Sequence, residues 1–222
     1  APTRKVIIGQ SEKSIVDNLK KTFSYQYPYS LDTLLPLKMG VTSAITYDVE
    51  NVVHMLFDEP TPDVERGVIA HSILENFNFN SSDNLVLQVG AMVYRGILTS
   101  EQVDKVNLTR IENAISSDAM KGLSGYKLYR EKQFLVNIEA NRILDTESQE
   151  NVLLQGVIDL LAIGKDNAII VDYKYSSLDK NSLKIKYSKQ LELYAYAVSK
   201  VLNIKVDKRV LVNLFTGESI EV

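Results

Sequence analysis

The sequence contains no cysteine. This absence excludes disulfide bonds and any iron–sulfur cluster held by cysteine thiolates. It fits a reducing compartment, and we predict a cytoplasmic protein. No apolar run approaches the roughly 20 residues of a membrane span, and the N-terminus has the features of neither a signal nor a transit peptide. We therefore expect no contact with a membrane.

The sequence also has no excess of positive charge. The net charge is −3 and the pI is about 5.5, whereas a protein that binds nucleic acid by itself is usually basic. Any contact with nucleic acid must therefore be local. The sequence has no G-x-x-x-x-G-K-[ST] loop, which excludes a nucleotide-driven motor within it.

The composition is that of one domain. Hydrophobic residues make up 45% of the 222 residues and charged residues 24%, and no sharp change in composition divides the chain. We expect one compact domain with an N-terminal arm. Because the sequence begins at Ala1 without a methionine, we expect it to be an excised part of a longer protein.

Two short apolar segments, Gly156–Ile163 and Ala168–Lys174, flank the turn residues Gly-Lys-Asp-Asn. This pattern predicts a β-hairpin. A tight turn in the middle of the four residues pairs Ile163 with Ala168 and places Asp159 opposite Asp172. A turn one residue later places Asp159 opposite Lys174 instead.

The two aspartates and the lysine share one face of the hairpin in either register, because side chains alternate with a period of two. The remaining strand residues are almost all apolar, as in strands that are covered on both sides. Two like charges so close together destabilise the pair. We therefore expect a cation between Asp159 and Asp172.

A divalent metal ion meets this requirement, since Mg²⁺ binds carboxylate oxygens and keeps water and phosphate in its remaining positions. Lys174 adds a second positive charge. Two acids and a lysine around such an ion suit phosphodiester hydrolysis, in which the cations offset charge on the phosphate and bound water is activated. A plain salt bridge between aspartate and lysine at a sheet edge is the alternative.

The motifs in and after the hairpin resemble those of RecB-type nucleases of the PD-(D/E)XK superfamily. They read G-V-I-D at Gly156–Asp159, I-I-V-D-Y-K at Ile169–Lys174 and Y-S-K-Q-L-E-L-Y-A-Y-A at Tyr187–Ala197. They resemble in particular the C-terminal nuclease domains of AddA-type subunits of bacterial helicase–nuclease complexes. The resemblance implies an α/β fold with a restriction-endonuclease-like core, in which helices flank a central mixed sheet.

The resemblance begins at Leu35, where L-P-L-K-M-G-V-T is similar to the start of AddA-type nuclease domains. Gly40 stands where serine is usual, so only the boundary is carried over. We therefore expect an N-terminal arm over residues 1–34 and a RecB-type nuclease domain over residues 35–222.

Residues 63–77 have apolar side chains at helical spacing, which predicts a helix with Asp63 as its N-cap. His71 follows Gly67 by one turn, and a glycine there lets another backbone or a substrate approach. Taken alone, His71 is either a core histidine or a ligand. The segment R-G-x-x-x-H-x-x-L-E resembles the histidine motif of the family, which implies that His71 binds the metal with the hairpin aspartates.

The resemblance assigns a role to each residue of the site. It implies that His71, Asp159 and Asp172 bind Mg²⁺, and that the backbone carbonyl of Tyr173 completes the shell. Histidine among oxygen ligands also suits Mn²⁺, and Ca²⁺ fits an oxygen-rich site. Asp159, Asp172 and Lys174 are the candidate catalytic residues, with Lys174 orienting or deprotonating the attacking water.

Residues 187–202 are predicted to form a helix on which Gln190 and Tyr194 lie one turn apart. In the family this Q-x-x-x-Y pair lies beside the active site, which implies that Gln190 supports the site or contacts DNA and that Tyr194 lies behind the ligands. A buried glutamine that satisfies backbone groups gives the same pattern.

Residues 175–189 are rich in lysine and are predicted to form a loop that leads away from the site. Lys184, Lys186 and Lys189 are candidate DNA contacts, because ammonium groups near a phosphodiester centre follow a strand through charge. A solvated loop without a ligand is the alternative.

Glu131 lies in a predicted strand, residues 129–136, that resembles the R-E-x-x-F strand before the catalytic hairpin of the family. We interpret Glu131 as part of a surface ion pair, and a role beside Lys174 or the metal is the alternative.

The N-terminal arm contains a predicted helix over residues 11–23 with Ser11 as its N-cap. An aromatic cluster made of Phe23, Tyr25, Tyr27 and Tyr29 overlaps its end. We expect this cluster to pack on its own domain, because aromatic residues are mostly buried. Base stacking is the alternative.

The motifs together predict an Mg²⁺-dependent exonuclease of the AddA type that functions in recombinational repair of double-strand breaks. The resemblance implies single-stranded DNA as substrate, delivered by a helicase portion of the same polypeptide, and its partner is expected to be a second nuclease subunit. The alternatives are a silent nuclease fold that serves as a scaffold or DNA clamp, and a nuclease with another target such as RNA.

Overall fold

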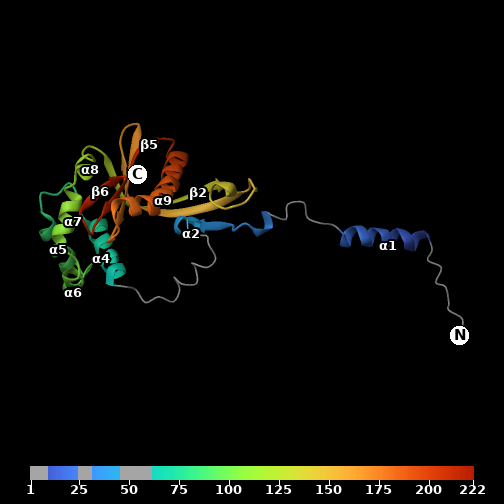
Figure 1. Cartoon of the computed structure of the whole chain (residues 1–222), viewed down its shortest axis with the longest axis horizontal. Helices are drawn as coiled ribbons and strands as arrows, with labels where there is room; N and C mark the ends of the chain where they lie inside the picture. Colours follow the sequence, from blue (N-terminus) through green and yellow to red (C-terminus); the bar gives the residue numbers. More distant parts are fainter. Residues whose placement is uncertain (1–9, 25–31, 46–61) are drawn as a thin grey trace.

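The computed structural model of the chain describes residues 10–24, 32–45 and 62–222 (Figure 1). Its strands are β1 (Lys38–Gly40), β2 (Lys127–Glu139), β3 (Asn151–Ile163), β4 (Asn167–Lys174), β5 (Lys205–Asn213) and β6 (Glu218–Glu221). Its helices are α1 (Gln10–Phe23), α2 (Val41–Ile45), α4 (Pro62–Asn76), α5 (Leu85–Tyr94), α6 (Ser100–Asp104), α7 (Leu108–Ile115), α8 (Asp118–Lys121) and α9 (Lys180–Leu202), with short 3-10 turns η1 (Asp32–Leu34) and η2 (Ala140–Arg142).

The strands form one six-stranded mixed sheet with β3 at its centre. Strand β2 runs antiparallel to β3 along almost its whole length, and the predicted meander β2–β3–β4 is present. Strand β5 lies parallel to β4, and β6 closes the sheet as an antiparallel edge strand. The sequence did not predict β1, which pairs parallel with β3.

Strand β3 changes its partner partway along one of its sides. Strand β1 pairs with it up to Gln155, and β4 pairs with it from Leu160 onward. Within the described part of the chain, no strand pairs with residues 156–159 on that side. The sheet is therefore split at this point, and we call the gap between β1 and β4 the sheet split.

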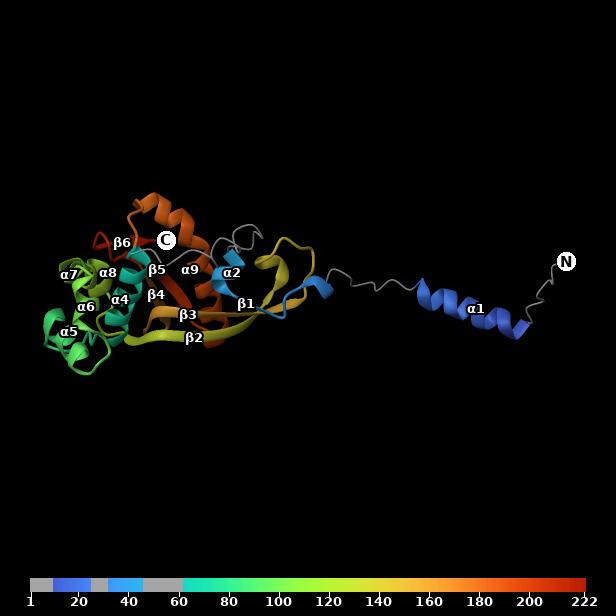
Figure 2. The same ribbon diagram turned by 90° about the horizontal axis from the view of Figure 1, so that it is seen from below.

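Helices cover both faces of the sheet (Figures 1 and 2). Residues of α4, α5, α7 and α8 form one apolar cluster with one face of β4 and β5, and residues of α9 and α2 form a second cluster on the other face. Six consecutive residues of β4 are buried, from Ala168 to Tyr173. Coverage on both faces explains why the β4 sequence is apolar without alternation. The predicted α/β architecture is confirmed.

The lysine-rich segment after β4 is helical, which corrects the prediction of a loop up to residue 189. Helix α9 begins at Lys180, and the Asp179 carboxylate accepts hydrogen bonds from the backbone N–H groups of Asn181 and Ser182 at 2.9 and 3.2 Å. This N-cap satisfies two free donors at the helix start, and lysine itself favours the helix.

Two other predicted caps lie inside their helices. Helix α4 begins at Pro62, so Asp63 lies in its first turn, where a negative charge still stabilises the helix dipole. Helix α1 begins at Gln10, so Ser11 is not its cap.

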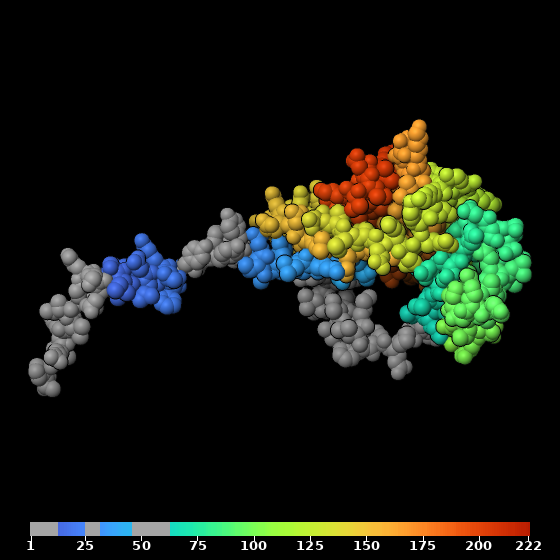
Figure 3. Space-filling view, turned by 180° about the vertical axis from the view of Figure 1, so that it is seen from behind, coloured from blue at the N-terminus to red at the C-terminus, as the bar shows by residue number. Residues whose placement is uncertain are grey.

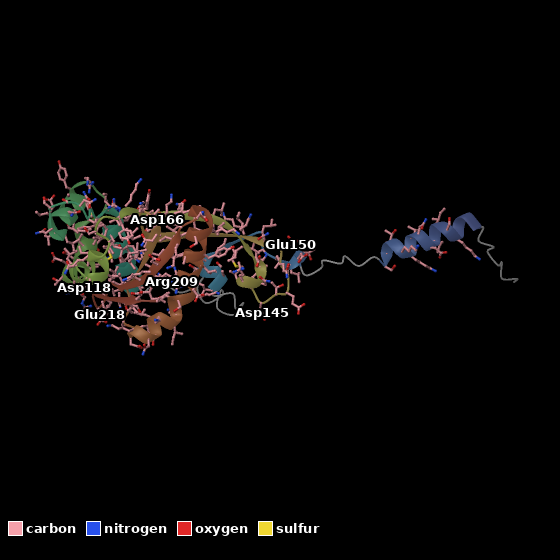
Figure 4. The ribbon with its side chains drawn as sticks, turned by 90° about the horizontal axis from the view of Figure 1, so that it is seen from above. Asp118, Asp145, Glu150, Asp166, Arg209 and Glu218 are labelled. Atoms are coloured by element: carbon pink, nitrogen blue, oxygen red, sulfur yellow. The ribbon has the colours of Figure 1, made fainter. Side chains whose placement is uncertain are left out.

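The N-terminal helix α1 lies apart from the sheet in Figures 1 and 2. The Phe23 side chain at its end is 85% exposed, so the expected packing of the aromatic cluster on its own domain is wrong for this residue. Tyr25, Tyr27 and Tyr29 lie outside the described residues. In Figure 4, Asp145 and Glu150 mark the β2–β3 connection on the side of the body that faces α1.

In the part of the chain that the structure describes, no helix combines the length and the apolar character needed to span a membrane.

Candidate active site

Carboxylates of three neighbouring strands lie at one level of the sheet. The β3–β4 register pairs Ile163 with Ala168, as predicted, and therefore brings Asp159 level with Asp172. The β2–β3 register brings Glu131 level with Asp159 from the other side. A row of acids, Glu131–Asp159–Asp172, thus crosses β2, β3 and β4.

The hydrogen-bonded ladder is interrupted at this row. The last β3–β4 pair is Leu160 with Val171, so Asp159 and Asp172 do not form the directly opposed pair that the hairpin prediction gave them. The Asp159 carboxylate instead accepts a hydrogen bond from the backbone N–H of Tyr173 at 2.7 Å. The side chain therefore takes the place of a strand partner, and this bond fixes its orientation.

Glu131 lies in the site, which agrees with the alternative interpretation of this residue and not with the favoured surface ion pair. Its backbone has φ = 47°, a left-handed conformation that is uncommon for a residue with a side chain and strained relative to a strand. The carboxylate forms no ion pair with any described residue, so the surface ion pair is wrong. Burial, together with the negative charges of Asp159, Glu75 and Asp172, raises the pKa of Glu131 to about 7.

His71 reaches the same point from helix α4. Its Nε2 atom lies 2.9 Å from the carbonyl oxygen of Tyr173. A carbonyl can only accept, so Nε2 carries the hydrogen and Nδ1 carries a lone pair. Nδ1 lies 3.7 Å from Asp159 Oδ2. Burial lowers the pKa of His71, and the ammonium of Lys174 lowers it further, which favours the neutral imidazole.

These groups form a set of potential metal ligands. His71, Glu131 and Asp159 each offer one nitrogen or oxygen atom, and the three atoms lie within 4.8 Å of one another. The lone pair of a neutral imidazole faces a carboxylate oxygen here, and two acceptors at this distance attract a cation. One nitrogen and several carboxylate oxygens suit Mg²⁺ or Mn²⁺. The donor set fits a divalent ion.

Asp172 belongs to a different part of the site. It is fully buried, and its Oδ2 atom lies 2.6 Å from the Nζ atom of Lys174. Its Oδ1 atom accepts a hydrogen bond from Gln190 Nε2 at 3.3 Å. Burial raises the pKa of Asp172 to about 6, although Lys174 opposes this shift. The structure therefore pairs Asp172 with an internal ammonium group and places Glu131 in the cluster around His71.

Lys174 is held as an ammonium ion. Burial by itself lowers its pKa, but the carboxylates of Asp172 and Asp159 outweigh burial, and the net shift is upward. Its Nζ atom also lies 4.9 Å from the centroid of the Tyr187 ring, a cation–π contact. A protonated Lys174 can donate hydrogen bonds to water or to phosphate. It cannot accept a proton from the attacking water, so its charge favours the role of orienting that water.

Gln190 and Tyr194 lie beside the site on helix α9. The Gln190 amide nitrogen donates to Asp172 Oδ1 and to the Tyr194 hydroxyl, the latter at 2.7 Å. Both amide hydrogens are thus used by side chains, and not by the backbone groups of the alternative interpretation. Burial raises the pKa of Tyr194, so its hydroxyl stays protonated.

The three candidate DNA-contacting lysines have different surroundings. Lys184 donates to the backbone carbonyl of Glu221 at 3.2 Å, and Lys189 lies 3.6 Å from Glu192. The Nζ atom of Lys186 lies 5.4 Å from the centroid of the Tyr187 ring, the same ring that contacts Lys174. Of the three, the structure connects Lys186 with the site.

An open groove of about 580 Å³ leads to this site along helix α4. A Cβ atom on Gly67 would lie 3.5 Å from the Cβ atom of Tyr175, an ordinary contact, so the approach of the chain just after β4 does not require glycine there. The groove is lined by residues of α4 and of the strand ends, among them Val64, Val68, His71, Glu75, Glu131 and Lys174.

Comparison with known proteins gives a consistent result. The sequence model of the PD-(D/E)XK nuclease superfamily matches residues 44–218. An ATP-dependent helicase/nuclease subunit from Clostridium acetobutylicum is 26% identical over 244 residues, which cover 95% of this chain and 19% of that protein. The corresponding subunit from Alkaliphilus metalliredigens is 30% identical over 218 residues, which cover 87% of this chain and 18% of that protein.

The chain spans about a fifth of the length of these curated relatives. Among solved structures, the crystal structure of SSO0001 aligns with a TM-score of 0.38 at 13% identity, covering 96% of this chain and 75% of that one. Because that score is low, the family assignment depends on the superfamily match and on the relatives above.

Proposed function

The chain belongs to the PD-(D/E)XK nuclease superfamily, and we propose that it is a metal-dependent DNA nuclease domain that hydrolyses phosphodiester bonds of single strands. One observation carries this proposal. The imidazole of His71 and the carboxyl groups of Glu131 and Asp159 converge within 4.8 Å at the end of a groove, beside an Asp172–Lys174 pair. This arrangement offers a place for a divalent ion next to a fixed positive charge.

The residues that would hold the ion are His71, Glu131 and Asp159, and Mg²⁺ or Mn²⁺ suits their donor atoms. A bound divalent ion would supply Lewis acidity, which stabilises charge on the phosphate and lowers the pKa of bound water. The ligand set implied by the family also includes Asp172 and the Tyr173 carbonyl. That carbonyl accepts from His71 and keeps a second lone pair.

The protein groups around the ion site have separate tasks in this proposal. Lys174 donates a hydrogen bond to the attacking water or to a phosphate oxygen and offsets negative charge in the transition state. Asp172 holds the ammonium of Lys174 in place, and Gln190 holds Asp172. The Tyr173 carbonyl fixes the imidazole of His71 so that Nδ1 faces the cluster.

We further propose a role within a helicase–nuclease of the AddA type, in which the helicase portion of the same polypeptide delivers the strand and the partner is a second nuclease subunit. The names of the relatives and the partial coverage of their length support this. A net charge of −3 suits a module to which DNA is delivered. Exonuclease activity in double-strand break repair and a cytoplasmic location belong to the same proposal.

The domain boundary at residue 35 is also part of the proposal. Strand β1 pairs with β3 as part of the central sheet, and helix α1 lies apart from that sheet in Figure 1. Both observations support a nuclease domain over residues 35–222 and an arm over residues 1–34.

The test is cleavage of end-labelled single-stranded DNA by the purified chain in Mg²⁺, Mn²⁺, Ca²⁺ or EDTA. We expect cleavage with Mg²⁺ or Mn²⁺ that disappears in EDTA and in Asp159→Asn. The matched control is Asp166→Asn, which makes the same change in the exposed β3–β4 turn (Figure 4) and should cleave normally. Cleavage of an RNA strand of the same sequence, measured in the same way, distinguishes RNA from DNA as the target.

Absence of cleavage has two distinct meanings. If calorimetry still detects Mn²⁺ binding that Asp159→Asn removes, the metal site is formed and the chain acts as a DNA clamp or scaffold. If neither cleavage nor metal binding is found, the nuclease proposal is wrong.

A further inference from the structure

The sheet split contains a second cavity that the catalytic arrangement does not use. Its volume is about 480 Å³, and it is lined by residues of β1, α2, β2, β3 and α9. On one side of β3, residues 156–159 have no strand partner in the described part of the chain. A sheet edge of this kind presents unpaired backbone N–H and C=O groups to a ligand.

Two aromatic rings form a corner of this cavity. Phe134 lies directly opposite Gly156 in the β2–β3 pair. A Cβ atom on Gly156 would lie 2.7 Å from the Phe134 ring, so the ring lies against the glycine backbone, in space that any side chain would occupy. The Phe134 and Tyr194 rings meet edge to face, with centroids 5.7 Å apart.

Tyr194 is only 5% exposed, whereas Phe134 is half-buried, so Phe134 carries the accessible ring surface of this pair. One ring directs its edge at the other, so its own faces are not covered by that partner. Both rings line the cavity together with polar groups, and such corners bind flat, unsaturated ligands. Every nucleobase has a π-face, so stacking of this kind tolerates different bases.

The cavity adjoins the row of acids. Gln133 and Val157 line it, and each lies two residues from a member of that row, Glu131 on β2 and Asp159 on β3. Two residues of a strand correspond to roughly 7 Å, which is of the order of one nucleotide step. The Tyr194 hydroxyl at the cavity also accepts from Gln190, which donates to Asp172.

We propose that this cavity binds one unpaired base of the DNA strand, belonging to a nucleotide next to the phosphate that is cleaved. The inference rests on the proposed nuclease function and deepens it. The base stacks on the Phe134 ring, next to the buried Tyr194 ring, and its edge faces the side of β3 on which residues 156–159 have no strand partner in the described part of the chain. Because a paired base would bring its partner strand into the same space, the cavity selects single strands. Figure 3 shows β2, in yellow-green, extending along the surface of the body.

The experiment uses a set of single-stranded oligonucleotides that each lack one base at a different position, together with one strand that has no bases at all. In the wild-type chain with Mn²⁺, we expect cleavage to slow about tenfold when the missing base lies at one fixed distance from the cleaved bond, which is within the range of base stacking on an aromatic ring. The base-free strand should be cleaved slowly.

Two variants and a matched control identify the cavity. Phe134→Leu removes the ring, and Gly156→Val places a side chain where the ring now lies. In both, the positional effect should disappear, while the base-free strand is cleaved as in the wild type. Phe79→Leu removes a similarly half-buried ring elsewhere and should keep the positional effect. Thermal unfolding checks that each variant is folded.

Equal cleavage wherever the base is missing would overturn the inference and leave the nuclease function intact. If no strand is cleaved in any metal, the proposed function fails instead. Fluorescence of 2-aminopurine placed along the strand then tests the cavity alone. Quenching at one position that Phe134→Leu abolishes supports the base site, and quenching that this variant does not change contradicts it.

Discussion

The two acidic neighbours of Asp159 differ in how their charge is balanced. Asp172, on β4, is fully buried and lies 2.6 Å from the ammonium of Lys174. Glu131, on β2, has no cation among the described residues and lies instead with His71 and Asp159 in a cluster of potential ligands. The protein thus neutralises one side of the row itself, and in the proposed function a bound ion neutralises the other side.

This comparison separates a structural pair from a ligand set. A buried carboxylate that loses its cation is costly, because its charge is no longer compensated. A half-buried carboxylate without a cation instead keeps its proton up to a higher pH. Changes on the two sides of Asp159 should therefore affect different measured quantities.

The largest effect is expected from the internal pair. Lys174→Met leaves Asp172 buried without its ammonium partner and should lower the free energy of unfolding by about 3–5 kcal/mol at neutral pH, besides removing cleavage. Urea denaturation measures the loss. The double variant Lys174→Met with Asp172→Asn should recover part of the stability but none of the activity. A single variant as stable as the wild type would show that the pair is not structural.

The next effect concerns the other side of the row. Glu131→Gln should raise the Mn²⁺ concentration needed for half-maximal cleavage by about 10- to 100-fold, as removal of a group that supports metal binding does. Without metal the same variant should be no less stable than the wild type, because it removes repulsion with Asp159. Titration of cleavage against Mn²⁺ gives the first value. Glu75→Gln, in the same groove, is the control and should change the metal requirement less.

A smaller effect is expected from pH. The pKa values of Glu131 and Asp172 are raised to about 7 and about 6. A raised carboxyl pKa means that the folded state binds more protons, so stability without metal should fall as pH rises from about 4 to 7. Thermal unfolding in EDTA measures this decline. Mn²⁺ should raise the midpoint more at pH 7.5 than at pH 5, and an equal gain at both values would contradict metal binding by the deprotonated carboxylates.

The smallest effect is expected outside the row. Lys186→Ala should weaken binding of single-stranded DNA a few-fold. It should also reduce the slope of log affinity against log salt concentration by the amount that corresponds to about one phosphate contact. Lys189→Ala should change neither, because the charge of Lys189 is offset by Glu192 at 3.6 Å. Fluorescence anisotropy at several salt concentrations distinguishes them. An equal loss of DNA affinity in both variants would show that the lysines contribute to binding through overall charge and not through a specific contact of Lys186.

The β4 side of the site was predictable because its connection is short. Four turn residues between two apolar segments limit the register to two possibilities, and the pairing of Ile163 with Ala168 is the one observed. Lys174 follows Asp172 by two residues, so their shared face follows from the strand period alone. Gln190 and Tyr194 were found through helical spacing and the family motif.

The β2 side was not predictable in the same way. Between β2 and β3 lies a long connection that includes η2, so no turn geometry fixes the position of Glu131 relative to Asp159. The left-handed backbone of Glu131 has no signal in the sequence. The lysine-rich helix start was also missed, although Asp179 offered an N-capping signal.

The sequence by itself determined the hairpin, the face that Asp172 and Lys174 share, and the helices that carry His71 and Gln190, and it limited the hairpin register to two possibilities. These depend on contacts between residues near one another in the chain. Only the tertiary structure decided that Glu131 joins Asp159, that Asp159 bonds to Tyr173 N–H instead of pairing across the strands, and that β1 and β4 leave the sheet split. Those features depend on how distant strands share the two sides of β3, and local patterns do not encode that choice.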